Sequence, residues 1–162
     1  MSKAVYAGTF DPITNGHLDI ALRASKLFDQ IIVAVAVDNN KNTLFSTEER
    51  CQMVADVIDG IPNATVESFS GLLVDYCQKQ GATSIIRGLR AVLDFEKEFQ
   101  MTLMNRSLHD DIDTVFLMSE AKYLFISSSL VKNAATLGGR IEDLVPPKVA
   151  EALVRKLAME KG

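Results

Sequence analysis

The sequence predicts an α/β fold: an open, mostly parallel five-stranded sheet with helices on both faces. Short apolar runs alternate regularly with amphipathic stretches along the 162 residues, which indicates repeated strand-helix units with right-handed crossovers. Residues 31–37 form a continuous apolar run, typical of a parallel strand that is covered on both faces. No linker, repeat or low-complexity tract interrupts the alternation, so we expect a single domain over residues 1–162.

In the first half of the chain, each element has its own local signal. Leu18, Ala21 and Leu22 fall on one face of a helix that follows an initial apolar run. Ser46 and Glu49 have the spacing of a capping box and start a second helix. The predicted strands are 5–8, 31–37 and 65–69, and a third helix covers 72–80, stopped by Gly81.

The second half continues the same pattern. A fourth strand at 84–87 is expected to end in a turn at 88–90, and a fifth strand covers 114–118. Phe95, Phe99 and Leu103 recur at helical spacing and predict a long helix that begins near Asp94. A short helix is expected to start at 127–129, where serine is a favoured N-cap, and a last helix follows the prolines at 146–147.

The topology predicts where a ligand binds. In open parallel sheets, ligands lie outside the carboxyl ends of the strands. Four segments meet this condition: 8–17, 38–45, 87–90 and the stretch after Met118. We therefore expect one site that draws on all four.

Composition excludes several classes of protein. A net charge of -4 argues against binding nucleic acid through a broad basic surface. No apolar run approaches the roughly 20 residues of a membrane helix, and the first residues do not resemble a signal peptide, so we expect a cytoplasmic protein without membrane contact. Two cysteines and two histidines are too few for a zinc site. The glycine-rich loops of dinucleotide-binding and P-loop enzymes are missing.

The connection after the first strand offers a different anion site. Gly8 lets a ligand approach the backbone closely, and Thr9 presents a hydroxyl and an N–H group. His17 lies at the start of the first helix, where free N–H groups and the positive end of the dipole favour an anion. An imidazole there can donate a hydrogen bond to a phosphoryl oxygen as charge builds. Taken alone, His17 could equally serve only as a cap of the helix.

Four stretches carry a family resemblance. Residues 8–17, Gly-Thr-Phe-Asp-Pro-Ile-Thr-Asn-Gly-His, resemble the signature of the nucleotidylyltransferase superfamily, and residues 126–132, Ile-Ser-Ser-Ser-Leu-Val-Lys, resemble its second motif. Residues 86–91 and 94–96 narrow the similarity to bacterial phosphopantetheine adenylyltransferases, over nearly the whole chain. The resemblance implies a Rossmann-like fold and reversible transfer of the adenylyl group of ATP to 4′-phosphopantetheine. The products are dephospho-coenzyme A and pyrophosphate, in coenzyme A biosynthesis.

The resemblance also implies roles for individual residues. The attacking group is the substrate's own phosphate, so the protein needs to supply positioning and charge stabilisation and no nucleophile. His17 is expected to stabilise the transition state at the α-phosphate. Expected contacts of phosphopantetheine are Thr9, Lys41, Leu73 and Arg87. Expected contacts of ATP are Thr9, Phe10, His17, Gly88, Leu89, Arg90, Glu98, Tyr123, Leu124, Phe125, Ile126, Ser127, Ser128 and Ser129.

Plainer roles remain open at several of these positions. From the residues alone, Lys41 could be a solvated loop lysine and Glu98 a solvated helix residue, while Arg87 and Arg90 could form surface ion pairs. No carboxylate cluster demands a protein-built metal site, so Mg²⁺ is expected to arrive with ATP, held by phosphate oxygens and water. Asp11 is the nearest candidate ligand and is expected to be structural.

Two alternative functions and two further expectations complete the predictions. The alternatives are a sister nucleotidylyltransferase with another phosphorylated acceptor, such as nicotinate mononucleotide, and a non-catalytic nucleotide sensor on the same fold. The resemblance implies a homohexamer. Feedback by coenzyme A is expected because this relative of the product should fit the same cleft.

Overall fold

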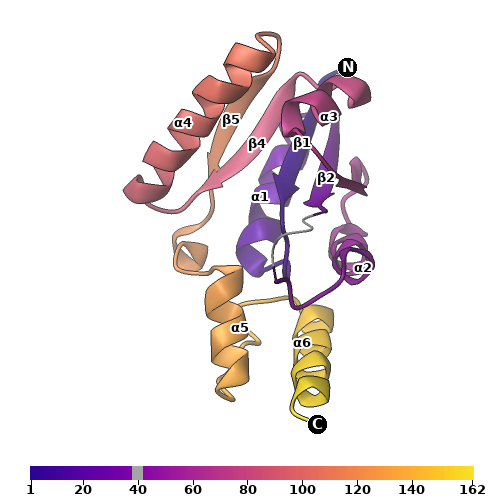
Figure 1. Ribbon diagram of the computed structural model, residues 1–162, viewed down its shortest axis with the longest axis vertical. Helices are drawn as coiled ribbons and strands as arrows, with labels where there is room; N and C mark the ends of the chain where they lie inside the picture. Colours follow the sequence, from indigo (N-terminus) through magenta and orange to yellow (C-terminus); the bar gives the residue numbers. More distant parts are fainter. Residues whose placement is uncertain (38–41) are drawn as a thin grey trace.

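The computed structural model describes residues 1–37 and 42–162, and its five strands form one sheet (Figure 1). Every neighbouring pair of described strands is parallel, in the order β3-β2-β1-β4-β5. This confirms the predicted α/β fold, with a sheet that is wholly rather than mostly parallel. The strands are β1 (Lys3–Gly8), β2 (Gln30–Ala36), β3 (Ala64–Phe69), β4 (Ser84–Leu89) and β5 (Asp113–Met118).

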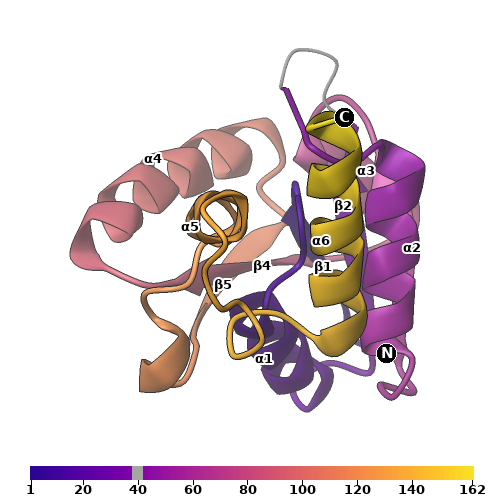
Figure 2. The ribbon, with the colours of Figure 1, turned by 90° about the horizontal axis from the view of Figure 1, so that it is seen from below.

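The helices are arranged on both faces of this sheet and beyond its carboxyl edge. Helices α1 and α2 pack on one face and α3 on the other, with α4 against β4 and β5. The last two helices project beyond the carboxyl ends of the strands, and α6 lies beside α2 (Figures 1 and 2). The helices are α1 (Asn15–Ser25), α2 (Thr47–Ile58), α3 (Leu73–Gln80), α4 (Val92–Leu108), the 3₁₀ turn η1 (Ala121–Tyr123), α5 (Ser128–Thr136) and α6 (Pro147–Glu160).

Alternating strand residues bury two separate apolar clusters. Tyr6 and Val33 face the cluster built with α1, α2 and α6, whereas Val5 and Ala34 face the cluster built with α3. Because side chains of a strand alternate between faces, both sides of β2 must be apolar. This explains the continuous run at 31–37. None of the described helices combines the length and apolarity needed to span a bilayer.

The predicted turn at 88–90 is wrong. Strand β4 continues through Leu89, whose partner in β5 is Met118. Glycine at position 88 indicates a turn by its flexibility, but here its ladder with β5 prevails. What Gly88 provides is space, because a Cβ atom there would lie 3.3 Å from Cγ1 of Ile20 in α1. The other boundaries moved by one or two residues, as helix and strand ends commonly do.

Strands β1 and β4 separate before either of them ends. Their paired register stops at Tyr6 opposite Ile86, although β1 runs on to Gly8 and β4 to Leu89. From β1 the chain builds the sheet outward to β2 and β3, and from β4 it builds outward in the opposite direction to β5. A parallel sheet binds ligands at such a reversal of strand order. The fold therefore places the site between the carboxyl ends of these two strands.

Candidate active site

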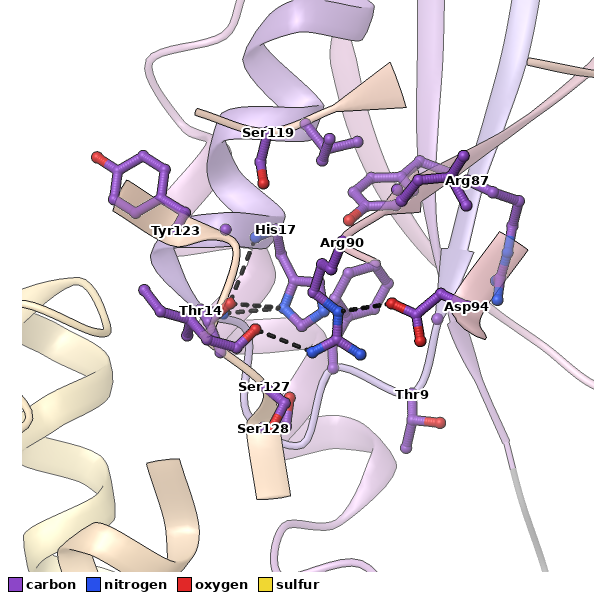
Figure 3. A pocket seen from close by; sticks show the side chains of 18 of the residues that line it. Thr9, Thr14, His17, Arg87, Arg90, Asp94, Ser119, Tyr123, Ser127 and Ser128 are labelled. Atoms are coloured by element: carbon purple, nitrogen blue, oxygen red, sulfur yellow. Dashed lines mark hydrogen bonds and ion pairs between the residues drawn. The ribbon is translucent and has the colours of Figure 1, made fainter. Parts of the chain in front are cut away.

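A cavity of about 350 Å³ opens at the reversal of strand order (Figure 3). Three of the four predicted segments line it. The fourth, 38–45, is described only from residue 42 onward, and residues 42–45 do not line the cavity. Lys41 lies outside the described residues. The lining comes from residues 6–10, 14, 16, 17, 20, 87–90, 94, 98, 119, 123 and 126–129.

His17 is fixed by the N-cap of α1. The N–H of Thr14 donates to Nδ1 of His17 at 3.0 Å, and the N–H of His17 donates to Oγ1 of Thr14 at 3.3 Å. This is a capping box in which histidine takes the place of the usual Glu or Gln. Because Nδ1 accepts a hydrogen bond, the neutral imidazole carries its hydrogen on Nε2. The cap thus orients His17 as a hydrogen-bond donor, and capping and catalysis are compatible roles.

The surroundings keep this imidazole neutral. Burial, together with the positive charges of Arg90 and Arg87, which act in the same direction, lowers the pKa of His17 to about 4. Protonation would also disrupt the cap, since a protonated Nδ1 cannot accept from Thr14. At neutral pH the side chain is therefore an uncharged N–H donor in a positively charged cavity.

This depressed pKa predicts a pH dependence of stability. The unfolded chain binds a proton at His17 near pH 6.5, but the folded chain only near pH 4. The stability that neutral His17 contributes is therefore fully present above about pH 6.5 and is lost as the pH falls toward 4, by up to about 3 kcal/mol. Between pH 7 and pH 4.5, we expect the melting temperature of His17→Gln to fall less than that of the wild type. Parallel losses in the two proteins would contradict this expectation.

Arg87 is held between β1 and α4. Its Nε donates to Oε2 of Glu98 at 2.8 Å and its Nη2 to Oε1 at 2.6 Å, while Nη1 donates to the carbonyl of Ala7 at 3.1 Å. The hydrogen bonds to Glu98 raise the pKa of Arg87, so the guanidinium is a permanent cation. Glu98 occupies the edge of the guanidinium group formed by Nε and Nη2. Two of the five N–H groups have no partner among the described residues and could bind a ligand phosphate.

Arg90 connects the end of β4 to the second motif. Its Nη1 donates to the carbonyl of Ile126 at 3.0 Å, and its Nε lies 3.5 Å from Oδ2 of Asp94 (Figure 3). Both carboxylates on the cavity, Asp94 and Glu98, are thus paired with arginines. Ion pairs were the plainer sequence-based interpretation of Arg87 and Arg90, and they are present. They hold both cations at the cavity.

Two helix N-termini also point to the cavity. That of α1 carries His17, and that of α5 begins at the serines of the second motif. Ser127 caps α5 by accepting the N–H of Leu130 at 3.1 Å, and Ser128 donates to the carbonyl of Pro12 at 2.8 Å. Helix N-termini together with arginine forks favour ligands with several phosphates. The cavity therefore brings together two arginines and two helix N-termini, groups that suit a polyphosphate.

Asp11 stabilises the loops around the site from outside the cavity lining. It is buried, and its Oδ1 accepts the N–H of Phe45 while its Oδ2 accepts the N–H of Leu44, both at 2.9 Å. Nζ of Lys132, the basic residue of the second motif, lies 2.7 Å from the same Oδ2. These contacts are structural.

Some predicted residues do not reach the cavity. Leu124 and Phe125 do not line it, and Phe125 is 63% exposed. Leu73 packs at the edge of the apolar cluster beneath α3 instead. The cause at 124–125 is the 3₁₀ turn η1, which no periodicity in the sequence indicated and which brings Tyr123 and Ile126 to the cavity.

The structure adds lining residues for which no role was predicted. Asp94 and Ser119 line the cavity, and Tyr6 and Ile20 complete its wall. Ser119 directly follows the end of β5, so the rule that strand ends form sites could have found it. Tyr6 lies on the face of β1 that packs against α1, α2 and α6. Its position in the sequence cannot be distinguished from that of an ordinary core residue.

Known proteins match most of this chain. The sequence model of the cytidylyltransferase-like family matches residues 5–134. The phosphopantetheine adenylyltransferase of Moorella thermoacetica is 57% identical over 156 residues, which cover 96% of this chain and 98% of the relative. That of Dictyoglomus thermophilum is 54% identical over 160 residues, 99% of this chain and 98% of the relative.

A solved structure shares the fold at low identity. It is a Vibrio parahaemolyticus protein assigned provisionally as a nicotinate-nucleotide adenylyltransferase, with a TM-score of 0.73 and 19% identity over 95% of this chain and 99% of its own. At 19% identity, this similarity shows a shared fold and nothing about function. It confirms the predicted architecture.

Proposed function

The chain belongs to the phosphopantetheine adenylyltransferases of the cytidylyltransferase-like family, and from this premise we propose how its cavity performs the reaction. The enzyme transfers the adenylyl group of ATP to 4′-phosphopantetheine in coenzyme A biosynthesis. The products are dephospho-coenzyme A and pyrophosphate. The observation that carries the mechanism is a neutral, capped His17 at a helix N-terminus near Arg90 and Arg87, whose Nε2–H has no partner among the described residues.

The transfer proceeds by direct attack. A phosphate oxygen of phosphopantetheine forms a bond to the α-phosphorus of ATP, and the bond from that phosphorus to the bridging oxygen breaks. Pyrophosphate leaves with the electron pair. His17 donates its Nε2–H to a non-bridging α-oxygen, where negative charge builds in the transition state. Arg90 and the N-terminus of α5 hold the leaving phosphates, and Arg87 and Thr9 hold the attacking one.

The remaining assignments rest on sequence to different degrees. Phe10, Gly88, Leu89, Tyr123 and the segment 126–129 line the cavity, which supports their proposed contact with ATP. The proposed contact of Lys41 with the substrate phosphate rests on the family resemblance. The contacts of Leu73, Leu124 and Phe125 stay predictions, because these residues do not line the cavity.

Mg²⁺ is proposed to bind with ATP. No group of three His, Cys, Asp or Glu side chains suited to a metal occurs among residues 1–37 and 42–162. The carboxylates on the cavity, Asp94 and Glu98, are engaged by arginines. Phosphate oxygens and water therefore fit as the ligands, and the ion would supply charge neutralisation to the triphosphate. Feedback by coenzyme A and a cytoplasmic location remain predictions from the sequence.

Release of pyrophosphate tests this function. The protein with ATP and Mg²⁺ should release pyrophosphate when 4′-phosphopantetheine is added, and chelation of Mg²⁺ should stop it. Nicotinate mononucleotide in place of phosphopantetheine should give no release. Release with that acceptor alone would select the sister enzyme, and binding of ATP without release under any condition would select the nucleotide sensor.

The surface of α4 supports the proposed homohexamer. Large apolar side chains are exposed along the whole length of this helix. The surface of a monomer usually exposes such side chains singly and scattered. Helix α4 lies at the side of the molecule, along the outer strand β5 (Figure 1). The exposed side chains are Val92, Phe95, Phe99, Met101, Leu103, Met104 and Leu108.

A charge on this face should break the assembly. We expect the wild type to sediment as six chains of 17.8 kDa and Leu103→Glu to sediment as smaller species, because an apolar contact cannot bury an unpaired carboxylate. Met159→Glu, exposed at the end of α6, serves as the control and should keep the wild-type mass. A wild type that sediments as a monomer would overturn the proposal.

A further inference from the structure

Arg50 is a charged side chain inside the protein that the mechanism above does not use. It lies in the first turns of α2 and is only 2% exposed. Burying a guanidinium is unfavourable unless its N–H groups are satisfied. Its described partners are the carbonyls of Thr9, Ala36 and Phe45 and the hydroxyl of Thr47, at 2.8, 2.9, 3.2 and 3.1 Å.

Two of these partners, Thr9 and Ala36, lie at the carboxyl ends of the neighbouring strands β1 and β2. One nitrogen, Nη1, donates both to Thr9 just after β1 and to Ala36 at the end of β2. Nε holds the carbonyl of Phe45, whose N–H is bound by Asp11 from the segment that follows Thr9. Arg50 therefore sets the position of the segment after β1 relative to the rest of the sheet edge.

The bond to Thr9 fixes the orientation of one particular peptide. The next residue, Phe10, has a φ of 50°, a left-handed conformation that is unfavourable for a bulky side chain. With the carbonyl of Thr9 held by Arg50, the N–H of Phe10 points the opposite way, because C=O and N–H are antiparallel across a trans peptide. Without this bond, the peptide could rotate and Phe10 could relax.

Such a rotation of the peptide would change the packing around His17. The ring of Phe10 lies edge-on to the His17 ring, with centroids 5.0 Å apart, and it fills the space that a Cβ at Gly8 would occupy. Thr9, Phe10 and His17 all line the cavity. The orientation of the peptide between Thr9 and Phe10 thus affects both the wall that meets the attacking phosphate and the packing of the imidazole.

We propose that Arg50 is a positioning residue for adenylyl transfer, holding the peptide between Thr9 and Phe10 in its reactive orientation from behind the cavity. The proposal rests on the function assigned to Thr9 and His17 above. Arg50 touches no substrate in this scheme. It acts through the backbone of the catalytic segment.

Arg50→Lys tests the proposal. Lysine keeps the charge, but its single Nζ cannot take the two separate positions from which Nε and Nη1 reach these carbonyls. We expect kcat to fall on the order of 10²-fold with the KM of each substrate within about threefold, because misalignment acts most strongly in the transition state. Val54→Ala is the matched control. It opens a cavity one turn farther along α2 at a side chain that cannot donate to these carbonyls, and it should lower the melting temperature without changing kcat.

Two outcomes would overturn the proposal. One is an unchanged kcat in Arg50→Lys. The other is that Val54→Ala, if it has the same melting temperature as Arg50→Lys, loses as much kcat as Arg50→Lys does. If Arg50→Lys does not fold, Thr47→Val replaces it, because it removes only the hydroxyl that steadies Nη2. It should lower kcat by about threefold to fivefold with little change in melting temperature. Unchanged kcat in Thr47→Val would then reject the proposal.

A spectroscopic readout separates this proposal from the proposed function. The ¹⁵N chemical shifts of the His17 imidazole report its tautomer and hydrogen bonding whether or not phosphopantetheine is the acceptor. Arg50→Lys should change these shifts and Val54→Ala should leave them as in the wild type. A wild type inactive with phosphopantetheine would refute the proposed function alone, and unchanged shifts in Arg50→Lys would refute the positioning role alone.

Discussion

Replacing His17 with alanine is expected to lower kcat by two to three orders of magnitude while the KM for ATP changes by less than about threefold. Loss of a preorganised donor to the charge of a transition state has an effect of this size. The ground state should lose little, because Arg90 and the N-terminus of α5, which line the cavity, are proposed to bind the other phosphates. An interaction made only in the transition state affects kcat and kcat/KM equally. Steady-state kinetics with both substrates varied measures the two effects.

His17→Gln is the matched comparison. Glutamine is a normal partner in a capping box, so its Oε1 can accept the N–H of Thr14 in place of Nδ1. Its amide then offers N–H donors near the position of Nε2. We expect Gln to restore the stability of α1 and a part of the rate, whereas Ala restores neither. If His17→Ala turned over at the wild-type rate, charge at the α-phosphate would have to be stabilised by another group.

The sequence predicted the helices, strands and motif residues of the site better than it predicted the contacts between their side chains. The fold followed from alternating apolar runs, and His17 followed from a short motif at a helix start, because both signals are local. Arg50 could not be identified in this way. Its partner Thr9 is 41 residues distant, and an arginine in an amphipathic helix is ordinarily solvated. Only the packed structure shows that this side chain is buried.

Glu98 illustrates the same limit within the cavity. The family resemblance assigned it to ATP, but the structure shows both carboxylate oxygens bound to Arg87. The two residues are eleven positions apart, on β4 and α4, and their meeting depends on how α4 packs against the sheet. Periodicity gives the faces of a helix but not its partners. This pairing yields the second strong prediction.

Arg87→Ala is expected to reduce kcat/KM for phosphopantetheine on the order of 10²- to 10³-fold. Two effects act in the same direction. The attacking phosphate loses its cation, and Glu98, whose side chain is only 17% exposed, becomes an unpaired carboxylate at a cavity that must bind anions. The second effect can be removed separately. Arg87→Ala combined with Glu98→Gln should therefore recover about tenfold of the loss.

Glu98→Gln by itself distinguishes the two roles of this carboxylate. If Glu98 acts through Arg87, the single change should affect the KM for phosphopantetheine more than the KM for ATP. The double variant should then retain more activity than the product of the relative activities of the two single variants. If Glu98 contacts ATP directly, the KM for ATP should rise and the two changes should combine independently. The bidentate geometry favours the first outcome, because Arg87 already engages both oxygens and leaves ATP no unpaired carboxylate edge.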